Sequence, residues 1–418
     1  MRLFACLVMI VLSAVPAAAE RRQPSAALAA AMNGREPQAA LALARTELRL
    51  CRAEAKAGDD CFALLWQNFF AHRWAGQVDA GIQYLKEALA IAEAGRATRQ
   101  EHWQLLAQIG VELEDLERRA DAEPYWRAVV ALMTGDPRED IYRLLLAENL
   151  RTQGKFLLAE GEVARAALAL QRSPAATPGR IASIHNLRAL ILDGQQRWAE
   201  AAIEFRLALA IRRADPQTKS NIVGRTYVNL LGPLLKLKRY DDAEQAVKEA
   251  LALDVTDDPA LIVQLVLLDA PLAEARADWA RAERAYRRAL ELQLAISRTS
   301  TATANVYHGL GSFLIERGRF AEGEPFQRSA YRIYRSRLSA DHPRRLAITI
   351  WLAGCLLRLD RAADARTLFR EAGRGFDTRV GDVRLAGTGS EAADRRRIFF
   401  GQVKTAWRVS VPSPRAIS

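Results

Sequence analysis

Cysteine and histidine are the residues in this 418-residue chain most able to do covalent or metal chemistry, and there are four and five of them. The five histidines are scattered along the chain without a spacing that suits a metal site, and they are His72, His102, His185, His308 and His342. A thiol nucleophile needs a base, and Cys355 with His308 or His342 is the one arrangement to weigh. Its apolar surroundings, Leu352-Ala353-Gly354 and Leu356-Leu357, favour a packed core residue instead.

Phosphate chemistry is not indicated either, because the chain has no glycine-rich phosphate-binding loop. The sequence therefore predicts a protein that is not an enzyme, with no catalytic residues, no metal and no cofactor.

Cys51 and Cys61 have a different setting. The nine residues between them include Gly58-Asp59-Asp60, where one helix should turn into an antiparallel neighbour. We expect a disulfide in an oxidising compartment, and two reduced, buried cysteines are the alternative.

The elements that hold these residues follow from a pattern that recurs eight times. An aromatic or large apolar residue is followed by a small residue three positions later and a large apolar one four positions after that. The small residues, which we call marks, are Gly81, Ala122, Ala159, Ala201, Ala243, Ala282, Gly323 and Ala365, with spacings of 41, 37, 42, 42, 39, 41 and 42. A fixed period of this length indicates stacked repeats.

A second position, twelve residues before each mark, is small in six of the eight repeats. Two antiparallel helices need small side chains where their backbones come closest, so each repeat is predicted to be a helix pair. Breaks such as Gly154-Lys155 separate the two helices, and proline-bearing loops such as Asp341-His342-Pro343 separate the pairs. Pro233 and Pro271 fall inside first helices, which favours a local bend, with a widened groove as the alternative.

The small and aromatic pattern resembles the tetratricopeptide repeat, and the period near 42 with its Asp-His-Pro loop resembles the longer kinesin-light-chain-type variant. The resemblance covers roughly residues 36–372, with an earlier helix near 37–55. It implies an all-α, superhelical solenoid of about eight to nine antiparallel helix pairs that binds a protein or peptide partner of unknown identity.

First helices of such pairs line the concave groove, so residues 18, 15 and 11 before each mark should face it. These positions include Ile141, Leu144 and Glu148 in the third repeat, and Leu190 in the fourth. Polar groove candidates that suit an extended peptide are Ser183, Asn186, Arg225, Gln264, Asn305, His308 and Ser312. A solvated groove without a partner is the alternative.

The N-terminus predicts export. Met1-Arg2, an apolar run over 3–15 and Ala17-Ala18-Ala19 are typical of a cleaved signal peptide, residues 1–19. A membrane anchor is the alternative, but thirteen residues span only about 20 Å of a bilayer core of about 30 Å. We expect a periplasmic protein if the source is Gram-negative, and a secreted one otherwise.

The chain has 60 Lys and Arg against 49 Asp and Glu, and residues 373–418 hold nine basic and four acidic side chains. Export argues against a nucleic-acid partner, so the tail cations Arg395, Arg396 and Arg397 indicate an anionic envelope surface, or simply a solvated surface.

The chain divides into 1–19, a repeat array over 20–372 and a basic tail over 373–418. In the tail we expect a loop over 373–389 and a capping helix from Ser390 to about Arg408. Residues 397–408 are similar to the segment that precedes caspase-like CHAT domains. The sequence thus favours an exported, non-enzymatic scaffold, and the alternative is a regulatory or substrate-recruiting subunit of a separately encoded enzyme, for example a CHAT-type protease.

Overall fold

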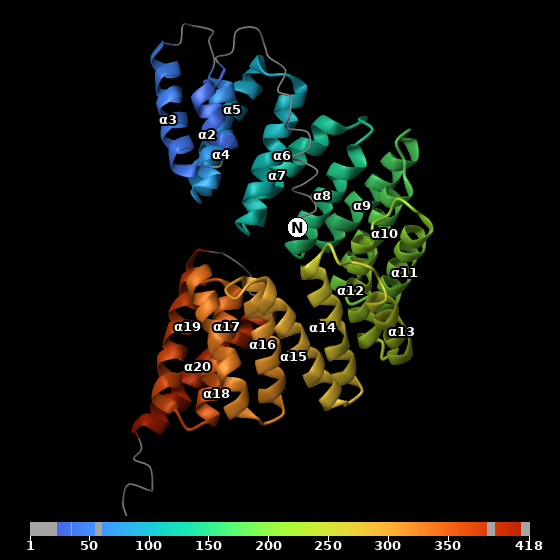
Figure 1. Cartoon of the computed structure of the whole chain (residues 1–418), viewed down its shortest axis with the longest axis vertical. Helices are drawn as coiled ribbons and strands as arrows, with labels where there is room; N and C mark the ends of the chain where they lie inside the picture. The colour runs from blue at the N-terminus through green and yellow to red at the C-terminus, as the bar shows by residue number, and fades with distance from the viewer. Residues whose placement is uncertain (1–22, 35, 55–60, 383–388, 411–418) are drawn as a thin grey trace, which may run out of the picture. The chain divides into compact units, whose positions relative to one another are not determined.

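The computed structural model describes residues 23–34, 36–54, 61–382 and 389–410, and every regular element within them is a helix (Figure 1). The signal peptide predicted over 1–19 lies outside the described residues. No described helix has the length and apolar character needed to cross a membrane.

The chain forms two compact units, residues 1–216 and 217–418. The helices of the first are α2 (Ala26–Asn33), α3 (Pro37–Glu54), α4 (Phe62–Trp74), α5 (Val78–Ile91) with a π-helical extension η1 (Ala92–Arg96), α6 (Arg99–Asp115), α7 (Arg119–Met133), α8 (Glu139–Thr152), α9 (Phe156–Arg172), α10 (Pro178–Gly194) and α11 (Trp198–Ala214). Those of the second are α12 (Ser220–Lys236), α13 (Tyr240–Leu251), α14 (Pro259–Ala275), α15 (Trp279–Ile296), α16 (Thr301–Glu316), α17 (Phe320–Arg337), α18 (Pro343–Arg358), α19 (Ala362–Asp382) and α20 (Gly389–Ser410). In both units consecutive helices pack as pairs, so the predicted all-α helix-pair architecture is confirmed.

Small residues hold the two helices of each pair together, as predicted. The six alanine marks are fully buried. A Cβ added to Gly323 would lie 2.9 Å from the carbonyl oxygen of Gly311, which is the residue twelve positions earlier. The same addition to Gly81 would reach the carbonyl oxygen of Phe69 at 3.2 Å. The helices of a pair therefore meet backbone to backbone, and a larger side chain would separate them.

The turn between the two helices of a pair is the same in all eight repeats. A residue with positive φ lies five positions before every mark, and these residues are Gly76, Glu117, Gly154, Gln196, Lys238, Ala277, Gly318 and Asp360. The next residue donates its backbone N–H to a carbonyl five residues earlier, at 2.8–2.9 Å. This closure satisfies the last carbonyls of the first helix and reverses the chain.

Charged side chains at these turns join consecutive repeats. In five repeats the residue after the left-handed position is an arginine or lysine that pairs with a carboxylate on the second helix of the preceding repeat. The pairs are Arg118 with Asp79, Lys155 with Glu123, Arg197 with Glu160, Arg319 with Glu283, and Arg361 with Glu324. We call this series the turn ladder.

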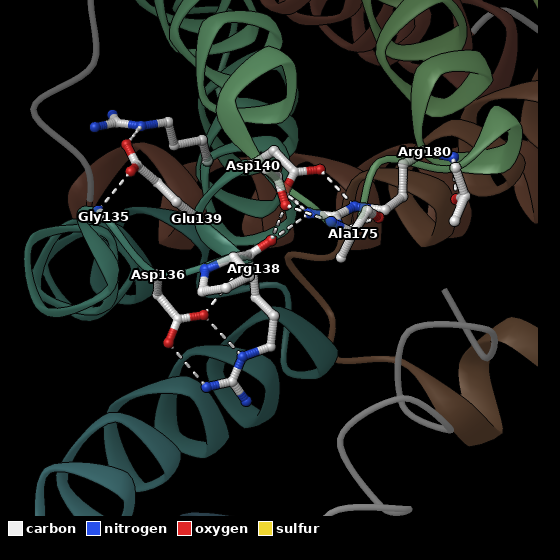
Figure 2. Close-up of polar contacts among 11 residues, drawn as sticks. Gly135, Asp136, Arg138, Glu139, Asp140, Ala175 and Arg180 are labelled. Atoms are coloured by element: carbon white, nitrogen blue, oxygen red, sulfur yellow. Dashed lines mark hydrogen bonds and ion pairs between the residues drawn. The ribbon is translucent and has the colours of Figure 1, made fainter.

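Consecutive repeats are also held together where one repeat connects to the next, as the contacts around the start of α8 show (Figure 2). Asp140 is fully buried and pairs with Arg180 of α10. Arg180 also donates to the carbonyl oxygens of Pro137 and Ala175, at 2.6 Å each. Arg180 therefore supplies the buried Asp140 carboxylate with a charged partner and connects α8 to α10. Loss of Arg180 would leave a buried charge unpaired.

Two details differ from expectation. Residues 373–382, predicted as loop, continue α19, because Gly373 and Gly375 serve close packing: an added Cβ would lie 2.7 Å from Gln402 Nε2 and 2.3 Å from the carbonyl oxygen of Ala340. Helix α2 precedes the predicted first helix. Pro233 and Pro271 lie inside α12 and α14, as the sequence predicts.

Two glycine-to-alanine substitutions should change stability in opposite directions, because one glycine lies in a left-handed turn and the other inside a helix. Gly154→Ala adds a Cβ at φ 77° and should lower stability by about 1 kcal/mol. Gly161→Ala, inside α9 with no atom within 4 Å of the new Cβ, should raise it by about 0.5–1 kcal/mol. Thermal unfolding midpoints of the two variants should move in opposite directions from the parent, and equal shifts would contradict the shared turn geometry.

Glu123 of the turn ladder should give stability a pH dependence. Burial raises its pKa, but hydrogen bonds from Lys155, Arg127 and Gln153 outweigh this and lower the pKa from 4.5 to about 2. A carboxylate with a depressed folded pKa stabilises the fold above its unfolded pKa, and the gain is lost as pH falls towards the folded pKa. Glu123→Gln should therefore lower the free energy of unfolding by about 1–2 kcal/mol at pH 7. The difference between parent and variant should shrink steadily as the pH falls below about 5.

Denaturant unfolding between pH 3 and pH 7 measures this difference. The matched control is Glu93→Gln, at an exposed carboxylate of η1 with no ion pair to the described residues, which should change little at any pH. If the loss in free energy of unfolding caused by Glu123→Gln did not vary with pH, the Glu123 carboxylate would not stabilise the fold through its ion pairs.

Candidate functional site

The first unit contains a pocket of about 260 Å³ formed by helices α6, α7, α8, α10 and α11. Its lining residues are Val111, Glu114, Asp115, Trp126, Leu144, Leu145, Glu148, Ser183, Asn186, Leu187, Leu190 and Arg212. Six of these occupy positions that the repeat pattern assigned to the groove, and they are Val111, Leu144, Glu148, Ser183, Asn186 and Leu190. The pocket thus joins the first helices of three successive repeats.

Trp126 of α7 is the largest side chain in the pocket lining and is fully buried. Gly110 of α6 makes room for it, since an added Cβ would lie 2.8 Å from the indole. The indole Nε1 donates to Glu114 Oε1 at 3.0 Å. Trp126 therefore fixes the carboxylate of Glu114 at the pocket wall.

Three carboxylic acids line the pocket, Glu114, Asp115 and Glu148. Glu114 also accepts a hydrogen bond from Asn149 at 2.9 Å, and burial raises its pKa despite both donors. Glu148 pairs with Arg151 at 2.7 Å. Asp115 is exposed and has no ion pair within the part of the chain that the structure describes. Asp115 is therefore the carboxylate best placed to receive a cationic group from a ligand.

Arg212 of α11 supplies the positive group of the lining. Its side chain is only 8% exposed, and burial lowers its pKa to about 10, so it remains charged at neutral pH. Ser183 and Asn186 line the same pocket, and the Ser183 hydroxyl donates to the Gly179 carbonyl oxygen at 2.8 Å. A buried guanidinium is a strong donor for carbonyl or carboxylate oxygens.

The remaining groove candidates lie in the second unit and do not line this pocket. Arg225 pairs with Asp258, the N-cap residue of α14, at 2.7 Å. Asn305 is exposed and accepts a hydrogen bond from the Tyr334 hydroxyl, and Gln264 is exposed.

His308 and Ser312 are brought together by Gln327 of α17. Gln327 is fully buried at the position where the repeat pattern has a large apolar residue. Its Oε1 lies 2.9 Å from His308 Nδ1, and its Nε2 donates to Ser312 Oγ at 3.0 Å. The two candidates therefore belong to an internal hydrogen-bond network.

Six pocket residues escaped the sequence reasoning. Trp126 and Arg212 come from second helices, which the groove rule did not include. The other four lie on first helices at positions that the rule did not sample, and they are Glu114, Asp115, Leu145 and Leu187. The available signal was Gly110, sixteen residues before Trp126, because a glycine there leaves room for a bulky side chain that crosses to the first helix.

Among the cysteines, Cys51 at the end of α3 and Cys61 before α4 form a disulfide with an S–S distance of 2.10 Å. Cys355 is buried, and its thiol donates to the Phe320 carbonyl oxygen at 3.5 Å. Burial raises the Cys355 pKa to about 11, so the thiol stays protonated and is a poor nucleophile at neutral pH. Within the described ranges no group of three or more His, Cys, Asp or Glu could hold a metal ion.

Comparison with known proteins supports the helical-repeat fold. Residues 302–374 match the tetratricopeptide repeat family. No curated protein matches the chain. Among solved structures, the apo form of RapI is 12% identical with a TM-score of 0.51, and the match covers 83% of this chain and 95% of that one. Aspartyl phosphate phosphatase F from Bacillus subtilis is 14% identical with a TM-score of 0.50, covering 86% and 95%. The chain therefore has the helical-repeat fold of these proteins, with a tetratricopeptide repeat segment at residues 302–374.

Proposed function

We propose that this chain is an exported, non-enzymatic scaffold that binds an extended segment of a partner protein across the first helices of its first unit. The observation that carries the proposal is the pocket that joins α6, α8 and α10. Helical-repeat proteins use this surface, where successive first helices lie side by side, to bind partners.

The chemistry of the lining indicates what the pocket accepts. Val111, Leu144, Leu145, Leu187 and Leu190 form apolar walls for one aliphatic or aromatic side chain. Asp115 at the rim would attract a lysine or arginine beside that side chain. Arg212 would donate to the backbone carbonyl oxygens of the segment. The preferred ligand is therefore an extended peptide with an apolar residue next to a basic one.

The alternative predicted from the sequence, a regulatory or substrate-recruiting subunit of a separately encoded enzyme such as a CHAT-type protease, would use the same pocket. The kinesin-light-chain-type period and the CHAT-linker resemblance of residues 397–408 support a scaffold of this kind without selecting an enzyme. The two functions differ in the partner, which is an enzyme in the second case.

Peptides selected on the purified chain from a random library displayed on phage provide the test. We expect the selected peptides to share an apolar residue adjacent to Lys or Arg, and Asp115→Lys to weaken their binding by at least tenfold, because it places a cation against the ligand's own. Fluorescence anisotropy with labelled peptides measures the affinity.

The matched control is Glu93→Lys, which makes the same charge change on an exposed carboxylate outside the pocket and should leave the affinity unaltered. A second variant, Leu190→Ala, removes apolar wall without altering charge and should also weaken binding. If Asp115→Lys and Glu93→Lys lowered the peptide affinity equally, the pocket would be excluded as the binding site. The loss would then be a general effect of charge.

Export has its own test. Supporting it are the apolar run over 3–15, the small residues 17–19 and a disulfide that forms in oxidising compartments. Expressed with its own N-terminus in a Gram-negative host, the chain should appear in the periplasmic fraction with Glu20 as its first residue, as intact mass would show. A cytoplasmic product that still begins at residue 1 would refute export.

A further inference from the structure

The last helix, α20, presents an apolar surface that nothing in the described structure covers. Phe399, Phe400 and Val403 are 60%, 64% and 52% exposed, and the two phenyl rings lie 5.8 Å apart. Adjacent exposed aromatic side chains of this kind usually mark an interaction site.

The orientation of α20 is fixed by its opposite side. Ile398 and Thr405 are buried, and an added Cβ on Gly401 would lie 2.4 Å from the ring of Phe369 in α19. Rotating α20 to bury Phe399 and Phe400 would break this close contact. The exposed rings therefore result from how the helix packs, and they face away from α19.

Cations surround these rings. Arg395 and Arg396 lie one helical turn before the rings, and Lys404 lies one turn after them. All three side chains are exposed. From Arg396 to Lys404 the helix advances about 12 Å. We define the α20 face as Arg395, Arg396, Phe399, Phe400, Val403 and Lys404.

The neighbouring helix adds to this charge. Arg370 and Arg374 of α19 are exposed and line a shallow hollow together with Gln402 of α20, with Asp377 as its one acidic residue. Neither these arginines nor the cations of the α20 face form an ion pair within the part of the chain that the structure describes, unlike the arginines of the turn ladder. Their charge is therefore available to an external anion.

We propose that the α20 face binds the surface of a bilayer containing anionic lipids, with the helix lying in the membrane plane. Its phenyl rings and Val403 enter the interface while Arg395, Arg396 and Lys404 contact lipid phosphates. An aliphatic side chain on the same face as the rings suits acyl chains better than stacked bases. A second copy of the chain would bring like charges together. The charge and the apolar centre of the face thus both favour an anionic bilayer.

The test uses the full chain and sedimentation with vesicles of phosphatidylcholine alone or with 30% phosphatidylglycerol. We expect binding to the anionic vesicles only, weakening as salt is raised. Phe399→Ala with Phe400→Ala should reduce it at least tenfold, and each neutralised cation by about fivefold.

Matched controls keep the comparison specific. Leu157→Ala with Leu158→Ala removes exposed apolar side chains from α9, and Arg284→Gln with Arg298→Gln removes exposed cations from the second unit. Both should bind vesicles as the parent does, and circular dichroism checks that every variant is folded. Equal binding to neutral vesicles would overturn the proposal. So would self-association or binding of single-stranded nucleic acid that depends on Phe399 and Phe400 while vesicles are not bound.

Discussion

Backbone contact between paired helices is the constraint on which the rest of the structure depends. At each mark a buried alanine or glycine lets the second helix lie against the first, and a carbonyl oxygen stands at the contact where Gly323 meets Gly311. The position of this contact fixes where the turn must reverse the chain, five residues before the mark. The turn then fixes where the cations of the turn ladder project. It also decides which side of each first helix remains to form a surface such as the pocket.

The regular parts of this arrangement could be predicted from the sequence because small residues at a fixed period leave few ways to pack. The marks, the helix pairs and six residues of the pocket lining all follow from that period. Other features depend on contacts between residues far apart in the chain. Arg212 reaches the pocket from a second helix, and Gly373 reads as a loop residue until Gln402 of α20 is seen to occupy the space beside it. Left-handed Lys238 and Ala277 carry no local signal, because the turn is imposed on them by the helices they join.

The charge of the molecule is best understood region by region. The chain has an excess of basic side chains, yet its pocket lining holds three carboxylic acids and one guanidinium. Ladder arginines are matched to carboxylates of the preceding repeat and contribute to stacking rather than to an external field. Within the residues that the structure describes, the cations of the α20 face have no such partners. One basic protein thus offers chemically opposite surfaces in its two units.

The link between Asp140 and Arg180 has a consequence for how the first unit comes apart. It ties α8 to α10, the first helices of consecutive repeats, through a carboxylate that is wholly removed from water. In a stack where each repeat is stabilised mainly by its neighbours, such a tie raises the coupling between two particular repeats above the rest. Opening one of them alone would leave a buried charge without its counter-ion, so the two should unfold together. The third and fourth repeats then act as a single cooperative block, and they are the repeats that contribute most of the pocket.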